Sequence, residues 1–171
     1  MRKEYGKALR MLFEQHMKRS LPDYVPVKIS SIYFTPGDRA FEKKAGNGTS
    51  LWISLSINPK YESFNIEIGW SKLGRWPELS MRPSSIRPNG SSEFAKEEYI
   101  TRLSFLWTID DYWFEIEPFD PNLDLEGIIE KMKPIKGDKA MKQVTPLVEE
   151  CFDKISKFAI SYFEGYTERS A

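Results

Sequence analysis

Two hydrophobic periods divide the chain into a helical start, a central set of strands and a helical end. In residues 3–20 apolar side chains recur at spacings of three and four, which is typical of one face of an α-helix. This helix is expected to end at Leu21-Pro22-Asp23, because proline disfavours helical geometry in the residue before it. His16 lies on or beside the apolar stripe and is expected to pack there.

Strict alternation of apolar and polar residues predicts strands in the middle of the chain. It is clearest in SLWISLSIN, from residue 50 onward, and in SFNIEIGWS over 63–71. In the second stretch, Phe64, Ile66, Ile68 and Trp70 alternate with polar residues or glycine, and we expect this strand to be central. Further strands are predicted over 27–35, 39–44, within 94–108 and over 112–117. The first two of these form a hairpin turned at Pro36-Gly37-Asp38.

The last quarter of the chain returns to the helical period. A short helix is predicted over 123–132, with Asn122 or Asp124 as its N-cap. Residues 138–144 are expected to add one or two helical turns. The last helix is predicted to begin at Thr145-Pro146, a capping residue followed by proline at the first helical position, and to end at Gly165. Its apolar face is wide enough to cover a sheet.

Strands clustered between helices predict an α+β fold. We expect a single domain over residues 1–171, with an antiparallel sheet of five or six strands. The N-terminal helix and the C-terminal helices pack on one face of this sheet. The length of 171 residues and the hydrophobic content of 40% allow a large core without disulfides or metals.

Charge is unevenly distributed although the formal net charge is zero. Residues 1–44 carry 10 basic and 5 acidic side chains, whereas residues 92–130 carry 2 basic and 11 acidic ones. One interpretation is two solvated faces that pair in the fold. The other is a dipolar surface that steers a charged partner.

The single cysteine, Cys151, cannot form an intramolecular disulfide, which favours a reducing compartment. No run approaches the roughly 20 apolar residues that cross a bilayer, and the N-terminus has no signal-peptide pattern. We therefore expect a cytoplasmic protein without a membrane partner.

The loop after the central strand, residues 69–88, is the first candidate for a functional surface. It combines three prolines, two tryptophans and several cations with one acidic residue, Glu78. Tryptophan and arginine are enriched at interface hot spots because they combine contact area with directional bonding. The candidate binding residues are Lys72, Arg75, Trp76, Met81, Arg82 and Arg87. The structural alternative is a loop that folds back, tucks Trp70 and Trp76 into the core and pairs its arginines with the acidic segment.

Enzyme motifs are largely absent from the sequence. There is no G-x-S-x-G elbow, no Walker loop and no G-x-G-x-x-G, and a zinc site has only one histidine and one cysteine to use. The sequence predicts no cofactor and no metal site. A carboxylate site remains as an alternative, built from Glu67, Glu115 and Glu117, with or without a divalent cation. The structural interpretation of these carboxylates is an exposed polar face with edge charges.

Nucleic-acid binding is a second alternative. Arg75, Arg82 and Arg87 could follow a phosphate backbone while Trp76 stacks on a base. Zero net charge and the dense acidic segment argue against it.

The run from Leu51 to Pro83, with LWISLSINP, FNIEIGWS and GRWPELSMRPS, resembles a family of small uncharacterised bacterial proteins that share a domain of unknown function. Some proteins of this build are encoded beside toxins or in defence loci. The resemblance therefore implies a protein of the immunity or antitoxin kind, and it assigns no catalytic residue.

Taken together, these patterns predict a non-enzymatic module that binds a protein partner. Arg75, Trp76 and Arg82 would anchor the partner, and the acidic segment would form a second patch. The sequence leaves the oligomeric state open.

Overall fold

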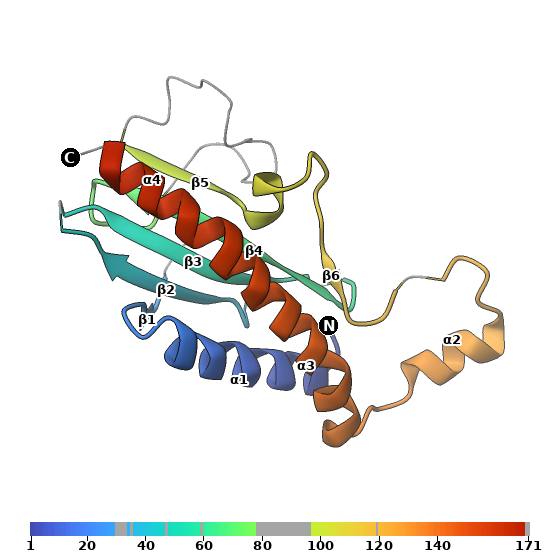
Figure 1. Cartoon of the computed structure of the whole chain (residues 1–171). Coiled ribbons are helices and arrows are strands. Elements are labelled where there is room, and N and C mark those ends of the chain that lie inside the picture. Colours follow the sequence, from blue (N-terminus) through green and yellow to red (C-terminus); the bar gives the residue numbers. More distant parts are fainter. Residues whose placement is uncertain are drawn as a thin grey trace.

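The computed structural model describes residues 1–29, 34, 36–46, 48–58, 60–77, 97–118 and 120–169, without the side chains of residues 132 and 166–169. This part of the chain forms a six-stranded antiparallel sheet with helices before and after it (Figure 1). The predicted α+β class, with five or six strands, is confirmed.

The helical segments are α1 (Lys3–Ser20), α2 (Leu125–Met132), α3 (Gly137–Lys154), α4 (Ser161–Arg169), the 3-10 segment η3 (Leu103–Leu106) and the π-helical segment η4 (Ile155–Ile160). The strands are β1 (Val25–Val27), β2 (Arg39–Lys44), β3 (Ser50–Ile57), β4 (Ser63–Ser71), β5 (Glu98–Arg102) and β6 (Phe114–Glu115). The strand order is β1-β2-β3-β4-β5, and β6 pairs with the start of β4. The strand predicted as central, β4, thus has β3, β5 and β6 as neighbours.

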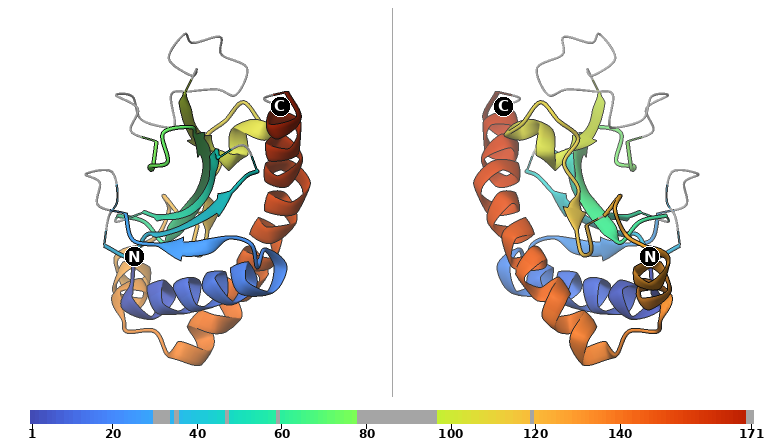
Figure 2. Two further views of the ribbon diagram at one scale, coloured as in Figure 1. Left: turned by 90° about the vertical axis from the view of Figure 1, so that its left-hand side faces the viewer. Right: turned by 90° about the vertical axis from the view of Figure 1, so that its right-hand side faces the viewer.

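The main core lies between one face of the sheet and the helices (Figure 2). Alternation along β3 and β4 points residues such as Ile53, Ile66 and Ile68 toward α1 and α3, whose Phe13 and Val148 are completely buried. At about 25 cal/mol per Å² of apolar surface, this burial is the main source of stability. Cys151 lies within this core with none of its surface exposed.

The opposite face of the sheet carries a smaller core. Trp52 on β3, Ala40 on β2 and Ile100 on β5 pack there with Trp76 from the segment after β4. Gly69 allows β5 to approach β4 on this face, since a Cβ at that position would lie 2.5 Å from the carbonyl oxygen of Tyr99. Both faces of the sheet are therefore partly covered.

The start of the last helix was predicted wrongly. α3 begins at Gly137, and Pro146 lies inside it. Ala140, Val144 and Val148 are buried at spacings of four on both sides of the proline, and their packing offsets the roughly 3 kcal/mol cost of an internal proline. The helical run then continues through η4 to Arg169 and so passes the expected end at Gly165.

Two predicted strands are shorter than expected. β5 stops at Arg102, where the chain turns into η3 and brings the Trp107 ring to 5.3 Å from the ring of Phe158. β6 is reduced to two residues, and its Phe114 stacks on Phe64 with 5.0 Å between ring centroids. Of the predicted strand 27–35, only Val27 is in a strand, as the last residue of β1. Residues 30–33 and 35 lie outside the described residues.

Among the described residues, each helix is either too short or too polar to span a lipid bilayer.

Candidate functional site

The proline-rich loop is described only as far as Pro77, so Met81, Arg82 and Arg87 lie outside the described residues. Trp76 is buried, with 7% of its surface exposed. Its ring meets the rings of Trp52 and Phe34 edge-on, at centroid distances of 5.3 Å and 4.9 Å. Trp76 is therefore a core residue, as in the structural alternative for this loop, and does not offer its ring to a partner.

The two described cations of the loop lie beside acidic residues. A guanidinium nitrogen of Arg75 is 3.4 Å from a carboxylate oxygen of Glu98, and about half of the Arg75 side chain is exposed. The side chain of Lys72 is exposed, and its backbone N–H donates to the carbonyl oxygen of Glu97. This end of the sheet thus brings a basic and an acidic segment together.

The three carboxylates of the alternative site do not converge. Glu67 pairs with Arg102 across β4 and β5, whereas Glu115 pairs with Ser63 near the other end of β4. Four residues along a strand correspond to about 13 Å. Glu117 follows β6 and binds Arg2 and Tyr5. The described residues contain no group of three or more His, Cys, Asp or Glu side chains arranged for a metal ion.

Glu67 nevertheless has an unusual environment on the face opposite the helices. Burial raises the pKa of its carboxyl group to about 7, while Arg102 and the Ser54 hydroxyl lower it and Asp38 raises it. Asn65 lies on the same side of β4 with 2% exposure, and neither polar atom of its amide has a hydrogen-bond partner in the described structure. These groups form a polar row beside the smaller core.

Glu117 belongs to a network that joins four segments distant in sequence. Its carboxylate accepts a hydrogen bond from the Tyr5 hydroxyl and forms an ion pair with Arg2. Arg2 also pairs with Glu62 at 3.1 Å and donates to the carbonyl oxygen of Lys131 at 2.9 Å. Burial opposes ionisation of Glu117, but the bonds from Tyr5 and Arg2 outweigh it and lower the pKa below its usual value. The network fixes the N-terminus to Glu117, ahead of α2, and to Lys131 within α2.

A cleft of about 690 Å³ opens beside this network, and we call it the arm cleft. Its lining residues are Arg2, Asn58, Lys60, Tyr61, Glu62, Ser63, Trp113, Glu115, Glu117, Pro118 and Lys131. Trp113 forms one wall and is held by Arg102, whose guanidinium carbon lies 4.7 Å from the centre of the ring. Tyr61 remains 58% exposed. The cleft therefore combines aromatic walls with charges of both signs.

Residues 120–136, here called the arm, carry α2 away from the rest of the molecule. Figure 1 shows most of α2 standing apart from the sheet and from α1 and α3, with extended chain on both sides, and the bond from Arg2 to Lys131 ties its end to the body. Asp124 caps the helix, since its carboxylate accepts the Gly127 N–H at 2.8 Å. The exposed fractions of Leu125, Ile128 and Ile129 are 71%, 46% and 52%. No residue of α2 with a described side chain is buried.

The three apolar residues of α2 form one stripe, because positions three and four apart share a helix face. From local signals the sequence predicts a helix over 123–132 with Asn122 or Asp124 as its N-cap, and the structure starts it at Leu125 with Asp124 as the cap. The sequence does not show that the apolar face lacks a cover, because that depends on where the arm leaves the body. The stripe is therefore a site that sequence reasoning did not single out, although it lies within the acidic segment proposed as a second patch.

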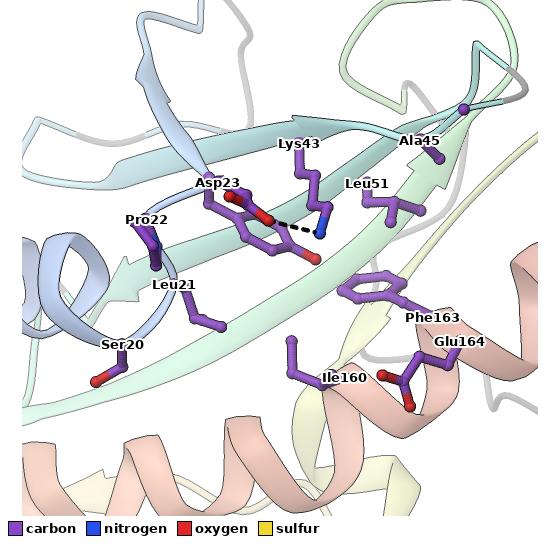
Figure 3. A pocket seen from close by; sticks show the side chains of 12 residues that line it. Ser20, Leu21, Pro22, Asp23, Lys43, Ala45, Leu51, Ile160, Phe163 and Glu164 are labelled. Atoms are coloured by element: carbon purple, nitrogen blue, oxygen red, sulfur yellow. Dashed lines mark hydrogen bonds and ion pairs between the residues drawn. The ribbon is translucent and has the colours of Figure 1, made fainter.

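A second cleft of about 700 Å³ lies between the α1–β1 turn, the ends of β2 and β3, and the C-terminal helix (Figure 3). Leu21, Leu51 and Phe163 give it apolar walls. The Lys43 ammonium at its rim is 3.1 Å from a carboxylate oxygen of Asp23, so this cation is already engaged within the protein.

The fold and these sites define an α+β protein with one projecting amphipathic helix. Comparison with known protein families, curated proteins and solved structures finds no match for the chain.

Proposed function

We propose that the protein acts by binding another protein, and that the arm carries the contact. The observation behind this proposal is the exposed stripe of Leu125, Ile128 and Ile129. Contiguous exposed apolar side chains are typical of interaction surfaces. An eight-residue helix is too short to be stable alone in water, so α2 gains most from packing against a partner.

The first part of the arm, residues 120–130, is acidic and adds selectivity to this contact, whereas Lys131, Lys133 and Lys136 follow in its second part. Asp124, Glu126 and Glu130 lie in α2 or cap it, Asp120 precedes it, and no basic residue occurs between 120 and 130. Such a rim favours a partner with cations beside an apolar groove and disfavours an acidic one. We thus keep the acidic segment as a binding patch and assign this role to the surface of α2.

The loop residues remain part of the proposal as a second contact. Lys72 and Arg75 supply its described cations, and Met81, Arg82 and Arg87 extend it beyond the described residues. An immunity or antitoxin role is the biological form implied by the family resemblance. A cytoplasmic location also belongs to the proposal, because Cys151 has no cysteine with which to form an intramolecular disulfide.

The alternatives receive less support. The separation of Glu67 from Glu115 gives a carboxylate enzyme no common site. Burial of Trp76 removes the ring that nucleic-acid binding would use for stacking.

Site-specific photo-crosslinking in cells tests the proposal. A benzophenone amino acid is placed at Ile128 in one variant and at Met11 on α1 in another. These two apolar residues have similar exposed fractions, 46% and 43%. We expect a discrete crosslinked polypeptide from position 128 and none from position 11, with the products identified by mass spectrometry.

Absence of any discrete product from positions 125, 128 and 129 would contradict the proposal. Equal products from positions 128 and 11 would also contradict it, because they would show contact without selectivity.

A further inference from the structure

We propose that the partner is a second copy of this chain, and that the arm of each copy docks into the arm cleft of the other. This inference rests on the proposed function and names the partner for the same surface.

The walls of the arm cleft fit the apolar stripe of α2. Tyr61, Trp113 and Pro118 offer rings to the aliphatic side chains of the arm. Tyr61 is more than half exposed in one copy, so docking would remove a large amphipathic ring from water. Trp113 is positioned in advance by Arg102 and by a hydrogen bond from its indole N–H to Asp111 at 3.3 Å. A fixed wall loses little entropy on binding.

The rims offer one complementary pair of charges, although the cleft also carries Glu115, a carboxylate without an ion-pair partner among the described residues. Lys60 on the cleft and Glu126 on the arm each lack an ion-pair partner among the described residues. Docking the arm of one copy into the cleft of the other brings an unpaired ammonium to an unpaired carboxylate. Arg2 does not serve this purpose, because Glu62 and Glu117 already occupy it.

The positions of arm and cleft favour a reciprocal contact. Pro118 and Lys131, from the chain just before the arm and from α2 itself, both line the cleft. Arm and cleft therefore lie at the same end of the molecule, and one two-fold axis can pair both arms with both clefts. Such a contact closes as a dimer instead of an open chain. It also buries twice the area of one docked arm, toward the roughly 1,000 Å² that a specific interface requires.

Light scattering after gel filtration tests this inference with the full chain. We expect the wild-type protein to have twice the chain mass of 20.0 kDa. An arm variant, Ile128→Lys with Ile129→Lys, and a cleft variant, Lys60→Glu with Tyr61→Ser, should each be monomeric. All four positions are exposed, so the fold should persist, and circular dichroism checks this. Met11→Lys is the matched control and should remain dimeric.

Mixing the two monomeric variants gives a sharper test. The mixture contains one intact arm and one intact cleft, so one of the two contacts can form. We expect the mixture to associate at least about tenfold more tightly than either variant alone, which corresponds to about 1.4 kcal/mol.

A wild-type chain that stays monomeric at its highest attainable concentration would overturn the inference. So would a dimer that survives the arm variant, or a mixture that associates no better than its components. A crosslink from position 128 to a different protein, with the purified chain monomeric, would overturn the second-copy inference and leave the proposed function standing. Failure of both experiments would overturn both.

Discussion

Glu67 shows how one residue on a mixed sheet face acquires an unusual acidity. It faces Arg102 in the strand register and lies beside Ser54, which has no exposed surface. Burial removes water from the carboxylate, and the favourable charge of Arg102 compensates only in part. The result is a carboxyl group that changes charge near neutral pH.

Replacing Glu67 by Gln should change the pH dependence of stability. Between the ordinary pKa of 4.5 and the folded value of about 7, the native state holds a proton that the unfolded chain has released. The free energy of unfolding therefore falls as pH rises through this window, by at most about 3 kcal/mol. Gln stays neutral, so Glu67→Gln should gain stability relative to the wild type between pH 5 and pH 8.

Urea unfolding at both pH values measures this difference. His16 and Glu117 also have shifted pKa values, but both are present in the two proteins, so their effects cancel in the comparison. Parallel pH profiles for the two proteins would show that Glu67 is ionised in the native state like an ordinary surface carboxylate.

The arm is the element whose structure depends most on local signals. The Asp124 cap closes its first turn, and the side chains described in α2 do not contact a core. In a free chain the helix is therefore held mainly by local propensity and capping, with one tertiary hydrogen bond from Arg2 to the Lys131 carbonyl oxygen near its end. This explains why the sequence predicts a helix here and includes Asp124 among its two candidate caps, although it places the start at residue 123 and not at Leu125.

Asp124→Ala should loosen α2 without affecting the rest of the fold. Loss of an N-cap costs about 1 kcal/mol, so the amides of α2 should exchange with deuterium roughly fivefold faster. Amides of α1 should be unchanged. Glu126→Gln is the control, because it removes a neighbouring charge and leaves the cap intact. Unchanged exchange in Asp124→Ala would mean that tertiary contacts, not the cap, hold this helix.

Elements fixed by tertiary contacts were predicted less well. The pair Thr145-Pro146 has the local pattern of a helix start, but the Thr145 hydroxyl donates back to the Met141 carbonyl at 2.8 Å inside α3. Burial of Val144 against the core decides the outcome, and no local signal reports it. The strand predicted within 94–108 was also too long. Its alternating pattern continues into η3, after the chain has left the sheet.

At the scale of the whole molecule, the two faces of the sheet have unequal cores. The larger one joins the sheet to α1, α3 and η4, while the smaller one depends on a few side chains around Trp52 and Trp76. The alternation in β3 and β4 predicts which residues face each side. It does not predict that the loop after β4 returns to cover the second face, because that contact joins segments far apart in sequence.

Trp76→Ala should therefore lower the free energy of unfolding by about 3 kcal/mol, as expected for removal of a buried aromatic ring. Arg75→Ala is the matched control from the adjacent position. Its half-exposed ion pair should contribute less than about 1 kcal/mol. Chemical denaturation of both variants measures these values. Equal effects would place Trp76 at the surface.

At this scale, oppositely charged segments that are far apart in the sequence form ion pairs in the fold. Arg2 from the basic segment binds Glu62 and Glu117 and so fixes the base of the arm to α1. The sequence indicates that the segments are oppositely charged, but pairing over such separations follows only from the fold.

The buried position of Cys151 has a practical consequence. Its thiol is fully enclosed and its pKa is raised by burial, so the reactive thiolate form is suppressed. Maleimide dyes should therefore not react with Cys151 while the protein is folded. A cysteine introduced anywhere on the exterior becomes the sole attachment point for a fluorophore or spin label, with no need to alter the interior first.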